Sequence, residues 1–593
     1  MRSPPSPDRT SSSASAPVAP ADGPALRIAV AAIVLVGVVL RVRQFAFGRP
    51  FWLDELFVAL NVSDRSFLEL LAPLAWDQSA PVLFLWAERL ALLVGGNGER
   101  VLRTPSLVAG CALLALVWLV GRRILGAAPA LLALLLAAVS PYLVYFSNEL
   151  KPYGLDAAVA LALVAVALRV LERPADRTRW AVLAVAGVVA LPLSSPAVFT
   201  LAAVGAALLA TAEVRRTAPA LVVGLGVLWA VAFATVYLLF LRHAAGNALL
   251  RAWFEEAFLV PGAPDFAERV ATAAGQVLLP PLYGTGGIVS GYLMLLLAAL
   301  GALGVVAVWR RAGVAVALLL VLPALGAAAA SATRRYPIEG RTMLYAAPFT
   351  ILLVAAGVFA LTAGVRRPRL AGGASWVVGG LLALPALALS AGHLARPVVR
   401  QDARPAIAYL RGVARGGDAL YLNRRARAAW AYYAARSPRA DSAHLAWLER
   451  AGTEPPLPNE WAATRMGASA RDGNVRRARD LVEVVQRYPT SWVSRSRALR
   501  DTLPVHAWAS SESARLRNAA PRGAWVLMVD QSAVLDSAFL AAVRRDGGRV
   551  APTVTASDVV LYRVDFPPPR SARNSHVGGP AAAPERAPAG GAR

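Results

Sequence analysis

Long apolar runs recur along most of this chain, and they constrain its fold more than any other feature. About eleven runs of roughly 15 to 24 residues are each long enough to cross a bilayer as a helix. Hydrophobic residues make up 57% of the 593 residues and charged residues only 16%, which is too apolar for a soluble protein of this length. We therefore predict a polytopic α-helical membrane protein with spans at residues 26–40, 104–120, 127–146, 155–171, 180–193, 197–212, 218–241, 288–309, 314–330, 342–365 and 375–389.

Arginines between the runs predict the direction of each span. Cytoplasmic loops are enriched in Lys and Arg, and pairs such as Arg310 and Arg311 follow alternate runs. This pattern places the N-terminus inside and the C-terminus outside. Arg334, Arg335 and Arg341 break the rule, because the count of spans places them outside. Either a span is miscounted or these arginines bind a ligand; we favour the ligand, for which a lipid phosphate is the natural partner.

The charge and the residue usage narrow the class of protein further. The net charge of +25 does not indicate nucleic-acid binding, because the arginines are spread between the apolar runs and through the C-terminal region. The single cysteine, Cys111, excludes an intrachain disulfide, and the five histidines are isolated, so no metal-ligand spacing is visible. Arginine is the default cation and Lys151 is the only lysine, which indicates GC-rich codons and a bacterial inner-membrane protein. A retained lysine suits a site that needs a compact point charge, although chance explains it equally well.

The composition changes on both sides of the apolar region. Residues 1–24 and 567–593 are predicted to be disordered tails, and residues 25–392 to form the transmembrane domain. Residues 393–566 are predicted to form a small extracytoplasmic α/β domain, with strands at 419–422, 524–530 and 559–564 and helices at 407–413, 426–435 and 534–545.

The segment after the first run carries two adjacent carboxylates, Asp54 and Glu55, at the membrane surface. Carboxylates beside a bilayer are costly to desolvate, so a Trp-Leu-Asp-Glu turn preceded by arginines suits chemistry on a phosphate-bearing substrate. The alternative is a solvated loop in which Asp54 caps a helix.

The rest of the outer loop, which we place at residues 41–103, mixes apolar and charged residues. We predict helices along the membrane interface at 67–74 and 81–94, because Glu88 would lie near the middle of the bilayer if the second helix spanned it. A true span with a paired Glu88 is the alternative.

Several short motifs in the first 160 residues resemble the GT-C membrane glycosyltransferases, and most closely the polyprenyl-phosphate-mannose protein mannosyltransferase group (glycosyltransferase family 39-like) and its bacterial relatives. The resemblance covers about residues 25–365 and rests on residues 52–55, 78–83, 98–106, 140–141 and 147–153. It implies that the acidic residue of the first outer loop, here Asp54 with Glu55 beside it, acts at the reaction centre. Many relatives have His-Pro-Pro where this chain has Ser79-Ala80-Pro81, and an arginine is common where Lys151 stands.

The residues and the resemblance together predict transfer of a sugar from a polyprenyl-phosphate donor to a hydroxyl of a protein, glycolipid or polysaccharide, at the outer face. We expect Asp54, with Glu55, to be catalytic, and the donor phosphate to be bound by Lys151, Arg334, Arg335 and Arg341. For each cation the alternative role is to anchor lipid headgroups. The resemblance allows a divalent cation, which the sequence does not show. Further candidate site residues are Arg41, Glu88, Arg103, Glu149 and Tyr153.

Two other functions remain open at this point. A lipid-linked-sugar flippase or transporter predicts polar residues inside several spans, whereas the spans after residue 155 are nearly uncharged. A non-catalytic anchor for the C-terminal domain would need neither so many spans nor a cluster of acids at the outer face.

Overall fold

The structure, a computed structural model, describes residues 23–246, 251, 253–283, 291–364, 367–415, 417–435, 448, 475–478, 481–486, 505–530 and 535–567. Most of the two predicted tails lies outside these residues. Contacts divide the chain into two units, the first comprising Met1–Arg400 with Ser491–Asp501 and the second Gln401–Thr490 with Thr502–Arg593.

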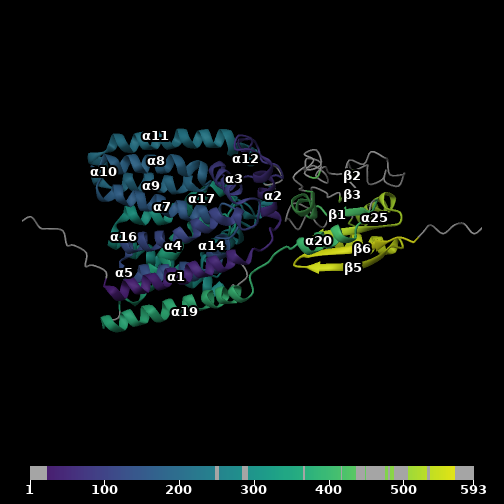
Figure 1. The fold of residues 1–593 in the computed structure, drawn as a ribbon. Helices are drawn as coiled ribbons and strands as arrows, with labels where there is room; N and C mark the ends of the chain where they lie inside the picture. The colour runs from purple at the N-terminus through teal and green to yellow at the C-terminus, as the bar shows by residue number, and fades with distance from the viewer. Residues whose placement is uncertain are drawn as a thin grey trace, which may run out of the picture. The chain divides into compact units, whose positions relative to one another are not determined.

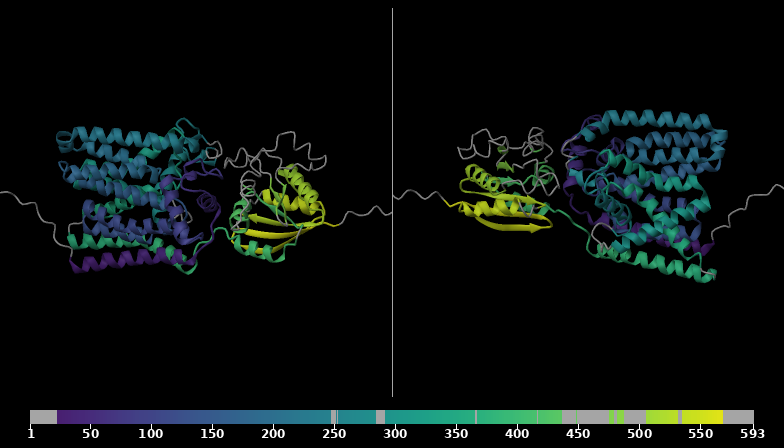
Figure 2. Two further views of the ribbon diagram at one scale, coloured as in Figure 1. Left: turned by 45° about the horizontal axis from the view of Figure 1, so that its top comes forward. Right: turned by 180° about the vertical axis from the view of Figure 1, so that it is seen from behind.

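The first unit is a bundle of long helices (Figures 1 and 2), with α11 on one flank and α19 on the opposite flank. Eight helices of the described residues are long and apolar enough to cross a membrane. They are α1 (Pro24–Phe47), α4 (Thr104–Leu125), α7 (Tyr153–Glu172), α11 (Pro219–Val236, continued by η3, Tyr237–Leu241), α16 (Gly291–Ala312), α17 (Val314–Ala332), α18 (Ala347–Thr362) and α19 (Pro368–Ala395). This confirms the predicted fold class.

The three other predicted spans are also helices, but shorter ones: α5 (Ala127–Val139), α8 (Arg177–Leu193) and α9 (Ala197–Ala210). The first predicted span is longer than expected, because α1 continues through Arg41 to Phe47. Arg41 is fully buried inside the bundle and donates to the carbonyl oxygens of Gly37, at 2.9 Å, and Ala137, at 3.2 Å. These bonds satisfy N–H donors of the buried guanidinium, so that the charged side chain is tolerated inside the bundle and the helix continues past it.

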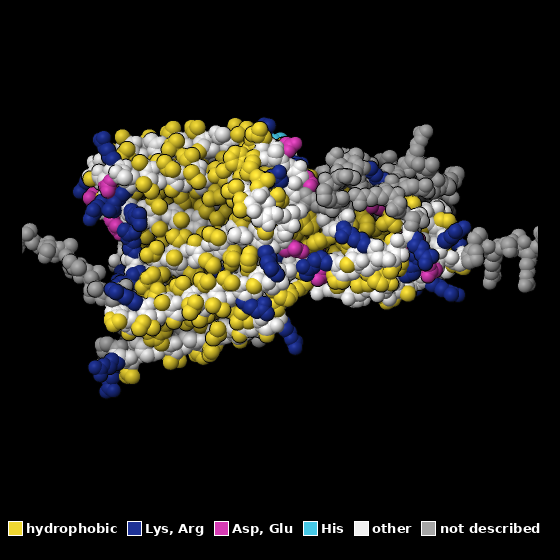
Figure 3. Space-filling view, in the orientation of Figure 1, with side chains coloured by type: hydrophobic (Ala, Val, Ile, Leu, Met, Phe, Trp, Pro, Cys, Tyr) yellow, Lys and Arg dark blue, Asp and Glu magenta, His cyan; other side chains and the backbone are white. Residues whose placement is uncertain are grey.

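Short helices join the spans. They are α2 (Leu53–Asp64), η1 (Glu69–Leu71), α3 (Val82–Gly95), η2 (Val101–Arg103), α6 (Pro141–Phe146), α10 (Ala212–Thr217), α12 (Arg242–Gly246), η4 (Glu255–Ala257), α14 (Phe266–Leu278), α15 (Pro280–Tyr283) and η5 (Leu344–Ala346). The helix predicted at 81–94 is present as α3, whereas the one predicted at 67–74 is reduced to the single turn η1. Basic side chains gather at the end of the bundle that carries α10 (Figures 1 and 3), and α4, α10 and α16 each have two arginines in their last turn. The predicted site lies at the opposite end, beside α2.

The helices α16 and α18 pack closely through glycines. A Cβ atom on Gly304 would overlap the carbonyl oxygen of Leu353, and one on Gly357 would overlap the carbonyl oxygen of Leu300. Small residues that let backbones approach are the usual means of helix packing in membranes. α18 is buried along most of its length, so this contact anchors the middle of the bundle.

A buried ion pair holds together the end of the bundle that carries α2. Glu55, in the first turn of α2, accepts from Arg103 through both oxygens, at 2.8 Å from Nε and 2.6 Å from Nη2. Arg103 also donates to the carbonyl oxygens of Arg49, at 2.6 Å, and Pro50, at 3.1 Å. Glu55 accepts a further bond from the backbone N–H of Leu150 at 2.8 Å. Three segments that are distant in sequence are thereby fixed to one carboxylate.

The second unit is built on a six-stranded sheet with the order β2-β3-β1-β4-β6-β5. The strands are β1 (Ala419–Leu422), β2 (Val475–Ala478), β3 (Leu481–Val485), β4 (Gly523–Val529), β5 (Arg549–Ala556) and β6 (Val559–Asp565). β1 pairs in parallel with β3 and β4, so that Tyr421 lies opposite Val484 and Val526, and the outer strands are antiparallel. The helices are α20 (Arg404–Val413), α21 (Ala426–Trp430), η6 (Ala431–Ala435), α25 (Val505–Ala519) and α26 (Leu535–Arg545).

The α16–α18 contact predicts a sharp difference between two glycines of one helix. Gly304→Ala should destabilise the protein by about 1–3 kcal/mol, because its new methyl group has no room. Gly301→Ala is the matched control: it has no heavy atom within 4 Å of the new Cβ and should not lower stability. The midpoints of thermal unfolding in detergent compare the two variants, and equal midpoints would contradict the tight contact.

The Glu55–Arg103 pair predicts a large loss of stability when one partner is removed. Glu55→Gln should cost about 3–5 kcal/mol, because it leaves the buried Arg103 guanidinium without its counter-charge. Glu172→Gln is the control, because it removes the partner of Arg123 in an ion pair at the surface, where the Glu172 side chain is 45% exposed and that of Arg123 36%. This variant should cost at most about 1 kcal/mol. The same unfolding assay applies, and similar losses for both variants would refute the structural importance of Glu55.

Candidate active site

The two adjacent carboxylates of the Trp-Leu-Asp-Glu turn have opposite environments. Both lie in the first turn of α2, where negative charge is favoured by the helix dipole. Neighbouring residues on a helix do not face the same way. The Glu55 side chain is therefore completely buried against Arg103, whereas the Asp54 side chain remains 24% exposed. Asp54 is the acid of this turn that a substrate can reach.

Asp54 is paired with a cation from a distant segment. It forms an ion pair with Nη1 of Arg341, whose Nε lies 4.0 Å from a carboxylate oxygen of Glu339. Burial alone would raise the pKa of Asp54, but the charges of Lys151 and Arg341 outweigh it and hold the pKa below its ordinary value. Asp54 is thus a carboxylate and not a carboxylic acid at neutral pH.

Lys151 supplies a second positive charge beside Asp54. It is buried, and its ammonium group donates to Oε1 of Gln78 at 2.8 Å. Burial lowers the pKa of Lys151, and the negative charge of Asp54 opposes that shift. Gln78 belongs to the motif at 78–83 but was not among the residues predicted for the site.

A further acid of this cluster, Glu149, is bound to Trp52. Its Oε1 accepts from the indole N–H of Trp52 at 2.7 Å, and its Oε2 has no hydrogen-bond partner among the described residues. Burial and the charge of Glu55 raise the pKa of Glu149. Glu149 therefore binds its proton more tightly than Asp54 does.

Two arginines of this cluster were missed in the sequence. Arg49 is buried, donates to the carbonyl oxygen of Asn148 at 2.7 Å and lies 4.1 Å from the Tyr145 ring centroid. Arg400 lies over the rings of Trp52 and Tyr145. The position of Arg49, six residues before Glu55, could have indicated that it belongs to the site. Nothing in the sequence marks Arg400 in this way.

The other predicted residues divide into two groups. Tyr153 is among the electrostatic neighbours of Arg341 and packs against Phe146, with 5.6 Å between ring centroids. Arg334, whose side chain is 54% exposed, pairs with Glu255 at 3.1 Å, and the exposed Arg335 donates to the Tyr237 hydroxyl at 3.1 Å. The structure therefore brings Arg341 to Asp54 but gives Arg334 and Arg335 other partners.

Glu88 is fully buried on α3, and neither of its oxygens has a hydrogen-bond partner among the described residues. Burial and the nearby charge of Glu55 raise its pKa well above the ordinary value. Three or more His, Cys, Asp or Glu side chains that could hold a metal are not found together in the described part of the chain.

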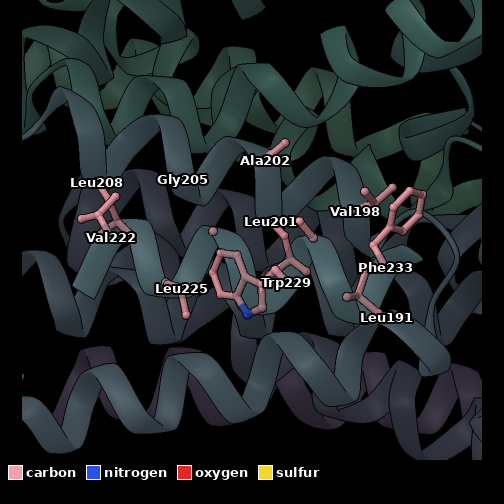
Figure 4. Close-up of a pocket in the computed structure, with 12 residues that line it drawn as sticks. Leu191, Val198, Leu201, Ala202, Gly205, Leu208, Val222, Leu225, Trp229 and Phe233 are labelled. Carbon is pink, nitrogen blue, oxygen red and sulfur yellow. The ribbon is translucent and has the colours of Figure 1, made fainter. Parts of the chain in front are cut away.

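An apolar cavity of about 260 Å³ lies between α8, α9 and α11 (Figure 4). Leu191, Leu201, Leu225, Trp229 and Phe233 are among the residues that line it, and no charged side chain does. The cavity therefore offers apolar contact but no group for acid–base chemistry.

Part of this chain is similar to a known protein family. Residues 79–240 match the family model described as dolichyl-phosphate-mannose-protein mannosyltransferase. This segment includes Glu149 and Lys151 but neither Asp54 nor Arg341. A search of curated proteins found no match to the chain.

Three similar solved structures all have TM-scores below 0.5. ArnT from Cupriavidus metallidurans in the apo state is 13% identical over 90% of this chain and 98% of that one, with a TM-score of 0.46. The same protein bound to undecaprenyl phosphate is 14% identical over 91% and 97%, with a TM-score of 0.44. The Archaeoglobus fulgidus oligosaccharyltransferase is 12% identical over 65% and 55%, with a TM-score of 0.42. The family match over residues 79–240 confirms the resemblance to the membrane glycosyltransferases of the GT-C superfamily that the sequence motifs predicted.

Proposed function

We propose that this protein transfers a sugar from a polyprenyl-phosphate donor to an acceptor hydroxyl at the outer face of the bacterial inner membrane. The observation that carries the proposal is the environment of Asp54, an accessible carboxylate kept ionised by Arg341 and Lys151. The family match over residues 79–240 supports a lipid-phosphate sugar as donor. The acceptor is a hydroxyl of a protein, a glycolipid or a polysaccharide.

In the proposed reaction, Asp54 takes the proton of the acceptor hydroxyl as the oxygen attacks the anomeric carbon. The bond between that carbon and the phosphate oxygen breaks, the polyprenyl phosphate leaves with the electron pair, and the anomeric configuration is inverted. Arg341 and Lys151 offset the charge that develops on the leaving phosphate. We assign Glu55 to positioning Asp54 through α2, because its own oxygens are occupied by Arg103 and Leu150.

Arg334 and Arg335, predicted as phosphate ligands, are assigned to lipid headgroups in this scheme, because their side chains are exposed and have other partners. No step is assigned to a metal.

Asp54→Asn tests the proposed base. Transfer of radiolabelled sugar from a panel of polyprenyl-phosphate sugars should fall by roughly 10²- to 10⁴-fold in purified membranes, because the amide cannot accept the proton. The control is Asp265→Asn. The Asp265 side chain is 46% exposed and is paired with Arg269. Transfer that survives Asp54→Asn would eliminate this base, and no transfer from any donor by the wild type would favour the flippase.

Arg341→Gln tests how Asp54 is kept ionised. A carboxylate whose pKa is depressed acts as a base above that pKa and loses activity only as the pH falls through it. The wild type should therefore keep its transfer activity down to pH values below about 4. In Arg341→Gln the pKa of Asp54 should rise, and the acid limb of the pH–rate profile should move to higher pH. Arg334→Gln is the control from the same segment, and coincident acid limbs for all three proteins would contradict the assignment.

A further inference from the structure

Arg400 is the last residue of the continuous segment Met1–Arg400 in the first unit, and the chain returns there to the cluster around Asp54 after the long helix α19. Its guanidinium carbon lies 4.5 Å from the centroid of the Trp52 ring and 4.9 Å from that of the Tyr145 ring. Trp52 is two residues before Asp54 and is itself fixed by its bond to Glu149. Two aromatic rings therefore hold one arginine beside the reaction centre.

Among the described residues Arg400 makes no hydrogen bond and no ion pair, although Asp54 and Glu149 are within electrostatic range. A guanidinium that contacts rings through its faces still carries five N–H donors in its plane. Their planar arrangement matches the oxygens of a phosphate in a two-bonded contact.

The other cations near Asp54 already have partners. Arg341 is paired with Asp54, Lys151 donates to Gln78, and Arg49 donates to the carbonyl oxygen of Asn148. Arg103 is bound to Glu55. In the described part of the cluster, Arg400 is therefore the cation best able to accept a new anionic ligand without breaking an existing contact.

We propose that Arg400 binds the phosphate of the lipid donor and of the polyprenyl phosphate that leaves, an inference that rests on the proposed function. Trp52 and Tyr145 orient the guanidinium, so that its N–H groups meet the phosphate oxygens while Asp54 faces the acceptor. The phosphate, and not an anionic group of the acceptor, is the ligand, because the leaving phosphate gains charge during transfer and Arg400 adds to Arg341 and Lys151 a cation that is not paired with Asp54.

The test compares binding of decaprenyl phosphate with binding of decaprenol, which lacks the phosphate, to full-length protein in detergent. The wild type should bind the phosphate more tightly. In Arg400→Gln this preference should shrink by roughly 10- to 100-fold, while binding of decaprenol is unchanged. Arg400→Lys should retain part of the preference, because it keeps the charge but loses the planar fork. Arg396→Gln, an exposed arginine four positions earlier, is the matched control and should behave as the wild type.

Each other outcome has a definite meaning. If Arg400→Gln unfolds at the same temperature as the wild type and keeps the full preference for phosphate, the inference is overturned and the proposed function stands. If it keeps that preference but shows a raised KM for the acceptor, Arg400 binds an acceptor anion and the inference is equally overturned. If the wild type itself does not prefer decaprenyl phosphate to decaprenol, the proposed function fails together with the inference.

Discussion

The end of the bundle that carries α2 depends on one buried ion pair, between Glu55 and Arg103. An unpaired charge at this depth would be unstable, so each side chain requires the other and the hydrogen bonds around them. Through this pair the chain after α1, the turn before α4 and the backbone at Leu150 meet at one carboxylate. The first turn of α2 is thereby fixed in its rotation, and that rotation directs Asp54 away from the core and toward Arg341.

The cluster around Asp54 shows how several ionised groups coexist in a largely buried place. Arg341 and Lys151 stabilise the charge of Asp54, while Glu149, with Glu55 nearby, is driven toward its protonated form. Trp52 links the two acids, since it binds Glu149 and precedes Asp54 by two residues. Opposite pKa shifts within one cluster are characteristic of functional sites.

Local pattern was sufficient to predict much of the architecture. Apolar length predicted the helices, and short apolar runs predicted β1, β4 and β6, because these signals come from neighbouring residues. β5 was missed because its side chains are mostly exposed and lack an apolar alternation.

The site was predicted less completely than the architecture. Asp54 and Glu55 are equivalent in the sequence, and only the rotation of α2 distinguishes them. Similarly, Arg341 could not be separated from Arg334 without knowing which segment faces α2.

The glycine contact between α16 and α18 also has a mechanical consequence. Backbones that touch at Gly304 and Gly357 leave no free volume between them, so this pair resists compression and separation alike. Between α9 and α11 the opposite holds, since Gly205 and Gly226 line a cavity and have no heavy atom within 4 Å of a Cβ position. Free volume that the α16–α18 contact lacks is therefore present between α9 and α11, and hydrostatic pressure would compress the α9–α11 contact before the α16–α18 contact.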